Sequence, residues 1–327
     1  MNERAEELAA YFRLMNANGA AHAYREAVRC GVLATLAGGE TRTVEDISRT
    51  CGTLAGPTRL LLDVLEAMSL VVRSNGGYAP TPLARVLGSG GYRNLGDEYW
   101  AHLPRLLKTG EPLVAMDAVA TSEAHYRAQA AALAWMLSAA AEEAAELLLS
   151  ETTDGELNIL DVGAGAALWS LSLARRVPGS RVTAVDWAGV LQVARETAAR
   201  FGLQDRLQTV TGNYHEVELP EHQFDLAILA NVTHLETSEG NRALLTKVRE
   251  TLKPGGRVVI VDVFPGRRPS DLNRTLYALG LALRTQHGRV STYQELERLM
   301  RETGFRNARL IPLEAPPHVL GMLLASV

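Results

Sequence analysis

Cysteine is scarce in this chain of 327 residues, which contains only Cys30 and Cys51. The two do not form a C-x-x-C pair, and the 8 histidines show no cluster with the spacing of metal ligands. A disulfide framework or a structural zinc site is therefore not expected. We expect two reduced thiols and no bound metal.

Strong charge and long apolar runs are also lacking. The net charge of -4 and the pI near 6.1 give no overall basic surface for nucleic acid or for an anionic membrane. The most alanine-rich run, residues 130–141, is far shorter than the roughly 18 apolar residues that indicate a membrane span. The acidic first residues do not resemble a signal peptide. We expect a soluble, cytoplasmic protein that acts on a small molecule.

One stretch, residues 158–168 with the sequence NILDVGAGAAL, organises the rest of the chain. Its apolar residues predict a strand that is buried on both faces. Gly163 and Gly165 predict a tight turn at which the backbone can approach a ligand closely. A helix is expected from Trp169 to Arg176, before Val177-Pro-Gly. This order is typical of a nucleotide site at the carboxyl end of a strand.

A second predicted strand, residues 181–185, ends in Asp186, twenty-one positions after Gly165. An acid about 20 residues past the glycines holds ribose hydroxyls in this architecture. A dinucleotide fingerprint needs a small residue where Leu168 lies, because the helix must pack closely on the strand there. NAD is therefore disfavoured as the ligand.

The glycine turn resembles the G-x-G-x-G turn of S-adenosylmethionine-dependent methyltransferases, here Gly163-Ala-Gly165-Ala-Ala167. The resemblance implies that S-adenosylmethionine is the cofactor, with its methionine part over the glycines, its ribose at Asp186 and its adenine beside Trp187. Asn213 lies where the family usually has an aspartate, and its amide oxygen would accept a hydrogen bond from adenine. The other donor-site candidates implied by the resemblance are Asp161, Gly212, Tyr214 and Asn231.

The first hundred residues have the pattern of helices with apolar faces, followed by a hairpin signal. A helix at residues 59–68 precedes two strands, 70–73 and 78–80, that flank Ser74-Asn-Gly-Gly77. This is the order of a winged helix. The helix that would enter DNA carries Arg59 beside Asp63 and Glu66, which is the wrong sign for phosphate contacts. DNA binding is therefore disfavoured.

The module resembles instead the N-terminal dimerisation domain of the plant caffeate-type and bacterial polyketide O-methyltransferases. The residues that carry the resemblance are Thr58–Leu62 and Gly77–Thr81. It implies a homodimer, with an all-α, winged-helix-like dimerisation domain at residues 1–108 and a methyltransferase domain at 109–327.

The second domain alternates strand and helix, which predicts an α/β fold with a parallel sheet. Strands are expected at residues 207–210, 224–229 and 257–261. One long helix is expected from about residue 126 to 149. The last two strands, 308–313 and 319–326, predict a closing antiparallel hairpin, as in a Rossmann-like methyltransferase sheet.

Residues 226–235 resemble the family's apolar strand followed by Asn-Val-Leu-His-Asp-Trp, whose histidine is the general base. His234 occupies that position, just past a predicted central strand, where ligands bind. A purely structural histidine is the alternative. Of the two acids that flank the base in the family, one matches Asp262. The other falls in a Glu-Arg-Thr motif that here starts with Val290, and Leu235-Glu236 replaces the Asp-Trp pair.

Several aromatic and sulfur side chains could either line an acceptor pocket or pack between helices. These candidates are Tyr99, Trp100, Trp135, Met136 and Tyr277.

Three functions remain open at this point. The first is methyl transfer to a hydroxyl of a small secondary metabolite, as in antibiotic biosynthesis. The second keeps the cofactor but changes the chemistry to C- or N-methylation, hydroxylation or decarboxylation. The third is a ligand-sensing winged-helix regulator.

Overall fold

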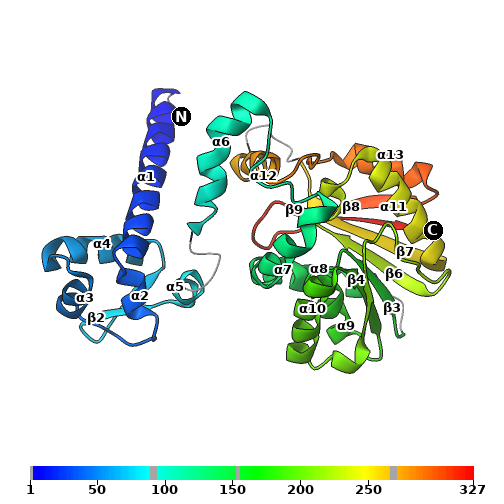
Figure 1. Cartoon of the computed structure of the whole chain (residues 1–327), viewed down its shortest axis with the longest axis horizontal. Helices are drawn as coiled ribbons and strands as arrows, with labels where there is room; N and C mark the ends of the chain where they lie inside the picture. The colour runs from blue at the N-terminus through cyan, green and yellow to red at the C-terminus, as the bar shows by residue number, and fades with distance from the viewer. Residues whose placement is uncertain (1–2, 89–93, 152–154, 266–270) are drawn as a thin grey trace. The chain divides into compact units, whose positions relative to one another are not determined.

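The computed structural model describes residues 3–88, 94–151, 155–265 and 271–327. The chain divides into two compact units, Met1–Glu98 and Tyr99–Val327, each of which is described by itself (Figure 1). No helix in the described ranges is long and apolar enough to cross a membrane.

The first unit consists of helices and one two-stranded ribbon. The strands β1 (Val71–Ser74) and β2 (Gly77–Pro80) pair antiparallel, which confirms the predicted hairpin and makes the unit not purely helical. Its core includes Ile47, Leu62 and Leu65, which are fully buried. Its helices are α1 (Glu3–Arg29), α2 (Val32–Leu36), α3 (Val44–Cys51), α4 (Ala55–Ala67) and α5 (Pro82–Leu87).

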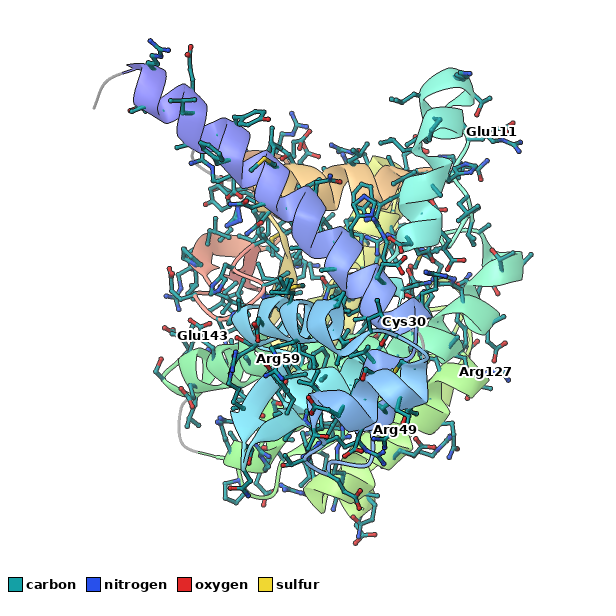
Figure 2. All side chains as sticks on the ribbon, turned by 90° about the vertical axis from the view of Figure 1, so that its left-hand side faces the viewer. Cys30, Arg49, Arg59, Glu111, Arg127 and Glu143 are labelled. Atoms are coloured by element: carbon teal, nitrogen blue, oxygen red, sulfur yellow. The ribbon has the colours of Figure 1, made fainter. Side chains whose placement is uncertain are left out.

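The charged side chains of α3 and α4 are paired with one another and with the ribbon. Arg49 and Arg59, labelled in Figure 2, lie 2.9 Å from Asp46 and 3.6 Å from Glu45. Arg73 of β1 contacts both Asp63 and Glu66 of α4, so these acids face a cation of the same unit. The helix that would enter DNA in a winged helix therefore presents an acidic, internally paired surface.

The second unit is built on a seven-stranded sheet with the order β5-β4-β3-β6-β7-β9-β8. The first five strands in that order are parallel, whereas β9 is antiparallel to both of its neighbours, as the sequence predicts for a closing hairpin. The strands are β3 (Asn158–Val162), β4 (Arg181–Asp186), β5 (Leu207–Thr211), β6 (Phe224–Ala230), β7 (Leu252–Val263), β8 (Arg306–Pro312) and β9 (Leu320–Ser326).

Helices cover both faces of this sheet because strand side chains alternate between the faces. Ile159 packs with α8 and α9, whereas the next residue, Leu160, packs with α11 and α13. Figure 1 shows the two helical layers on opposite sides of the strands. The helices that begin in this unit are α7 (Val119–Met136), α8 (Ser138–Leu149), α9 (Leu168–Arg176), α10 (Ala188–Phe201), α11 (Ser238–Thr251), α12 (Leu272–Ala282) and α13 (Tyr293–Glu302), and α6 (Asp97–Thr109) runs across the division between the units.

The single long helix expected before the sheet is wrong, because the chain forms α7 and α8 with a break at Leu137. Leu137 leaves helical geometry with φ −100° and ψ 2°. The hydroxyl of Ser138 then donates a hydrogen bond of 2.9 Å to the carbonyl of Trp135. The alanine-rich sequence contains no glycine or proline to signal this break.

The turns after β3, β4 and β6 meet at the carboxyl edge of the sheet. Gly163 and Ala164 donate backbone hydrogen bonds of 2.9 and 3.1 Å to Val185 at the end of β4. Asn231, after β6, donates one of 2.8 Å to Val261 of β7. Because parallel strands all end at this edge, residues far apart in sequence converge here.

Gly163→Ala should destabilise the second unit more than a substitution at an equally left-handed glycine. Both Gly163 and Gly202 have positive φ, +64° and +69°, and any L-residue there is strained by about 1–2 kcal/mol. A Cβ on Gly163 would also lie 2.6 Å from a methyl group of Val232, whereas one on Gly202 meets nothing within 4 Å. Overpacking adds about 1–3 kcal/mol. Unfolding both variants in denaturant measures their free energies of unfolding. An equal loss of this free energy in the two variants would contradict the prediction.

Candidate active site

A cavity of about 460 Å³ opens at the carboxyl edge of the sheet, within the second unit. This volume falls in the range of about 300–1,000 Å³ that is usual for small-molecule sites. The glycine turn after β3 and the turns after β4, β5 and β6 form one part of its wall. The apolar side of α7 and residues of α12 form another.

The glycine turn and Asp186 are joined by short hydrogen bonds. The carboxylate of Asp186 accepts the backbone N–H groups of Gly165, at 2.8 Å, and Trp187, at 2.7 Å. Gly165 has φ +56°, and a Cβ there would meet no protein atom within 4 Å, so the backbone borders open space. Burial raises the pKa of the Asp186 carboxyl, although the two N–H donors oppose the rise. A narrow ligand can therefore lie directly on this backbone beside a carboxylate.

The side chain of Trp187 connects β4 to α7. Its indole N–H donates a hydrogen bond of 3.1 Å to the hydroxyl of Ser122, and both residues line the cavity. The backbone N–H of Gly189 donates to the carboxylate of Glu123 at 2.8 Å. These contacts hold α7 over the turn after β4, as a wall above the predicted donor site.

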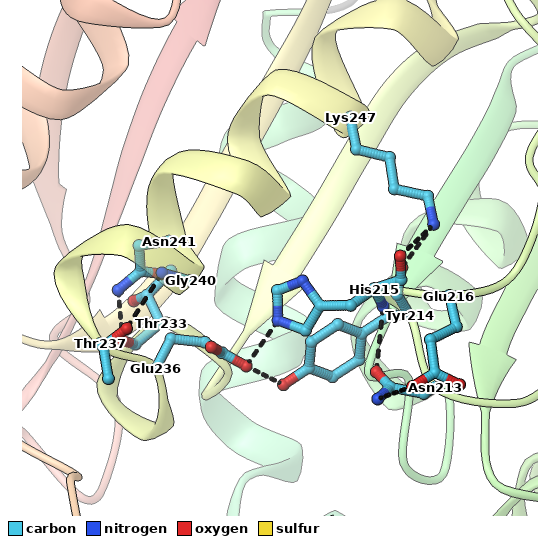
Figure 3. Close-up of polar contacts among 10 residues, drawn as sticks. All are labelled: Asn213, Tyr214, His215, Glu216, Thr233, Glu236, Thr237, Gly240, Asn241 and Lys247. Atoms are coloured by element: carbon cyan, nitrogen blue, oxygen red, sulfur yellow. Dashed lines mark hydrogen bonds and ion pairs between the residues drawn. The ribbon is translucent and has the colours of Figure 1, made fainter.

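The loop after β5 is held by Glu236, as Figure 3 shows. One oxygen of Glu236 accepts the hydroxyl of Tyr214, at 2.6 Å, and lies 3.0 Å from Nε2 of His215. Burial would raise the pKa of Glu236, but the hydrogen bonds from His215 and Tyr214 outweigh burial and lower it. Lys247 of α11 donates to the carbonyl oxygens of Tyr214 and His215 at 2.9 and 3.0 Å. The loop is therefore fixed from both sides.

The sequence marks Glu236 as a departure from the family pattern but gives no partner for it. The structure shows that Glu236 and His215 are a pair, and that both line the cavity. The amide oxygen of Asn213, expected to face adenine, accepts the backbone N–H of His215 at 3.0 Å and retains one lone pair.

His234 and Asp262 are brought together as the sequence predicts. His234 lies in the short 3-10 helix η3 (Thr233–Leu235) after β6, and its Nδ1 is 2.7 Å from one oxygen of Asp262 in β7. The other oxygen of Asp262 accepts the hydroxyl of Thr233 at 2.6 Å and the backbone N–H of His234 at 3.1 Å. The N–H of Val263 donates to the first oxygen at 2.7 Å. The carboxylate is thus almost fully coordinated.

Nε2 of His234 has no hydrogen-bond partner in the described part of the chain, and the residue lines the cavity. The imidazole packs edge-on against the ring of Tyr277, with 5.9 Å between ring centroids. Because Nδ1 faces a carboxylate, Nδ1 carries the proton in the neutral ring and Nε2 is a proton acceptor. This is the arrangement of a general base.

Not every predicted site residue reaches the cavity. Gly163, Gly165, Asp186, Trp187, Asn213, Tyr214, Asn231 and His234 line it, whereas Asp161 and Gly212 do not. Asp161 is buried behind the turn and accepts a hydrogen bond from the hydroxyl of Ser170. Burial raises its pKa to about 7. Asp161 therefore supports the glycine turn from inside the fold.

The candidate residues for the acceptor pocket also divide into those that line the cavity and those that do not. Met136 and Tyr277 line the cavity, but Tyr99, Trp100 and Trp135 are not among its described lining residues. Tyr99 contacts the site indirectly, through a hydrogen bond of 3.5 Å from Gln129. Apart from Met136, the side of α7 that faces the cavity was not singled out from the sequence, although helical spacing is a readable signal. The α7 residues that line the cavity are Val119, Ser122, Tyr126, Gln129, Ala130, Leu133, Ala134 and Met136, and Leu137 at the end of the helix lines it too.

A mostly parallel sheet with an inserted antiparallel strand and a cavity over a glycine turn is an α/β architecture that binds a ligand at the carboxyl ends of its strands. Residues 111–306 match the family model described as an O-methyltransferase domain. The match covers more than half of the chain, and the chain belongs to the family of S-adenosylmethionine-dependent O-methyltransferases. S-adenosylmethionine is its cofactor.

Relatives of known activity are similar to this chain over most of their own length. Acetylserotonin O-methyltransferase of Mus musculus is 29% identical over 304 residues, which are 84% of this chain and 78% of the relative. The tetracenomycin polyketide synthesis 8-O-methyl transferase of Streptomyces glaucescens is 25% identical over 319 residues, 87% of each chain. The crystal structure of human N-acetylserotonin methyltransferase with S-adenosylmethionine has the same fold, with TM-score 0.72, 22% identity and coverage of 100% and 98%.

Asp186→Ala should weaken binding of S-adenosylmethionine by about tenfold or more, because charge-assisted hydrogen bonds to the ribose would be lost. Since burial raises the pKa of Asp186, affinity in the parent should also fall at low pH, from a higher pH than for an ordinary aspartate. Calorimetry measures both effects. Asp117→Asn changes another carboxylate of the cavity and is the control. Unchanged affinity in Asp186→Ala would exclude this residue from the donor site.

Proposed function

We propose that this enzyme methylates a hydroxyl of a small secondary-metabolite acceptor, and that His234 is the general base. The observation that carries the proposal is the imidazole of His234, which lines the cavity and is fixed by Asp262 through Nδ1, while Nε2 has no hydrogen-bond partner among the described residues. Proton removal by a positioned imidazole typically contributes about 10²- to 10⁴-fold to a rate.

The donor would be held by the glycine turn, Asp186, Trp187 and the loop at Asn213–Tyr214. The fit is supported by the open space above Gly165 and by the free lone pairs of Asp186, which can accept from hydroxyls beyond its two N–H donors. When bound, S-adenosylmethionine supplies a sulfonium methyl group to an oxygen nucleophile. The protein has only to align that oxygen and remove its proton.

Asp262 supports the proton transfer by its own rigid environment. Its carboxylate stabilises the imidazolium that forms when His234 takes a proton, and four hydrogen bonds fix its position. The position of the family's second acid is occupied by Val290, which packs against the core. Thr233 and the two backbone N–H donors supply the orientation that a second acid would otherwise add.

His234→Ala should lower turnover by about 10²- to 10⁴-fold and leave donor affinity intact, because other residues hold the donor. Asp262→Asn should lower turnover less, since the base remains but is poorly oriented. Turnover and calorimetry test this, with the exposed His287→Ala as the matched control. Parental turnover in His234→Ala would favour chemistry without proton abstraction by this residue.

We also propose that the chain is a cytoplasmic homodimer that associates through the first unit. The support is a set of large apolar side chains on α1 that are at least 47% exposed: Leu8, Tyr11, Phe12, Leu14 and Met15. Leu8, Phe12 and Met15 follow helical spacing and so share one face. Exposed apolar patches of this kind mark association surfaces. Both cysteines are free thiols, as suits a reducing compartment.

Replacing Leu8 and Phe12 together by Glu should convert the dimer to a monomer, because two charges would be buried at the interface without partners. Light scattering measures the mass. Ala17→Glu adds a charge at an exposed position on the opposite side of the same helix and should leave the dimer intact. A dimer that survives the double substitution would place the interface outside this face of α1.

A further inference from the structure

Arg284 is a cation of the cavity that lacks a counterion. It follows the carboxyl end of α12, and its Nε donates a hydrogen bond of 2.8 Å to the carbonyl of Gly280. Its Cζ lies 5.9 Å from the centroid of the Tyr277 ring. No ion pair or further side-chain hydrogen bond joins its guanidinium to the described residues. The side chain is therefore oriented, but its terminal amino groups are unused.

The carboxylates that line the cavity have donors of their own. Asp117 accepts the backbone N–H groups of Gln286 and His287 at 2.8 and 2.6 Å. Asp186 and Glu236 are held by the contacts described above. Among the described lining residues, Arg284 is the only arginine or lysine.

The tyrosines near Arg284 do not neutralise it. Burial raises the pKa of both Tyr126 and Tyr277, so their hydroxyls stay protonated at neutral pH. A half-buried guanidinium without a counterion is costly, and a carboxylate is its best partner because two parallel hydrogen bonds can form.

We propose that Arg284 binds a carboxylate of the methyl acceptor, which makes the acceptor a small aromatic hydroxy acid and not a neutral phenol. The aromatic part is inferred from the ring of Tyr277 next to Arg284 and from the other apolar residues of the same cavity, Leu133, Met136 and Leu281. This inference rests on the proposed function, because the acceptor hydroxyl must lie at His234. The ring of Tyr277 contacts both His234 and Arg284, which puts base and anchor on one side of the cavity.

The methyl donor also has a carboxylate, but its predicted site lies elsewhere along the sheet edge. The glycine turn follows β3 and Asp186 ends β4, whereas His234 follows β6, Asp262 lies in β7, and α12 follows β7. Arg284 therefore lies with the residues of the acceptor end. The experiment below separates the two carboxylates.

The test compares aromatic acids with their primary amides, which have nearly the same shape but no charge. Hydroxylated benzoic, cinnamic and naphthoic acids and their amides are titrated into the enzyme saturated with S-adenosylhomocysteine. At least one acid should bind about tenfold or more tightly than its amide in the parent, as a charge-assisted hydrogen bond allows. Arg284→Gln should abolish that preference and Arg284→Lys should retain part of it. Arg298→Gln, an exposed arginine of α13, should retain all of it.

A parent that binds no acid of the panel more tightly than its amide would overturn the proposal. So would an Arg284→Gln variant, folded by its melting temperature, that keeps the preference. A second titration compares the affinity for S-adenosylmethionine with that for 5′-methylthioadenosine, which lacks the amino-acid carboxylate. Selective loss of S-adenosylmethionine binding in Arg284→Gln would assign the arginine to the donor and overturn the proposal.

The same titrations separate this inference from the proposed function. If acids bind through Arg284 but His234→Ala does not change their methylation, the anchor stands and the base assignment fails. If neutral phenols are methylated in a His234-dependent way and acids show no preference, the base stands and the anchor fails.

Discussion

The geometry around His234 depends on the hydrogen bonds that the carboxylate of Asp262 accepts. It lies near the end of a central strand and accepts hydrogen bonds from Thr233, His234 and Val263, so it closes η3 onto β7. Without these bonds, four donors in a buried place would be left unsatisfied, at a cost of about 1–3 kcal/mol each. The same contacts that stabilise the turn after β6 therefore also set the tautomer and direction of the imidazole.

Much of the second unit could be predicted because its signals are local. The strand before Gly163, the turn itself and the acid at the end of β4 are each encoded within a few residues, and the parallel order follows from alternation of strand and helix. The break at Leu137 could not be predicted, because it depends on packing within an alanine-rich sequence that has no helix breaker. Trp135 was a poor candidate for a related reason: Met136 lines the cavity but Trp135 does not, and the sequence alone does not tell which side of the helix faces the cavity.

The contacts that sequence reasoning missed are those between positions that are distant in the sequence. Glu236 is recognised from the sequence only as a departure from the family pattern, and His215 is not singled out at all. In the fold they form one hydrogen-bonded pair with Tyr214 that ties the loop after β5 to the segment that carries His234. Burial of a carboxylate is tolerated there because both donors point at it. A lone sequence gives no means to see that these two side chains meet.

The distribution of charge along the cavity suits a reaction between a cationic donor and an oxygen that becomes negative as its proton leaves. Opposite charges are neutralised in such a transfer, and an apolar wall favours neutralisation relative to water because it solvates charge poorly. Leu133, Ala134, Leu137 and Val232 supply that wall. In the proposed reaction the proton is not released into it, since a protonated His234 would form a compensated ion pair with Asp262. The cavity can therefore exclude water without having to bury an isolated charge during the methyl transfer.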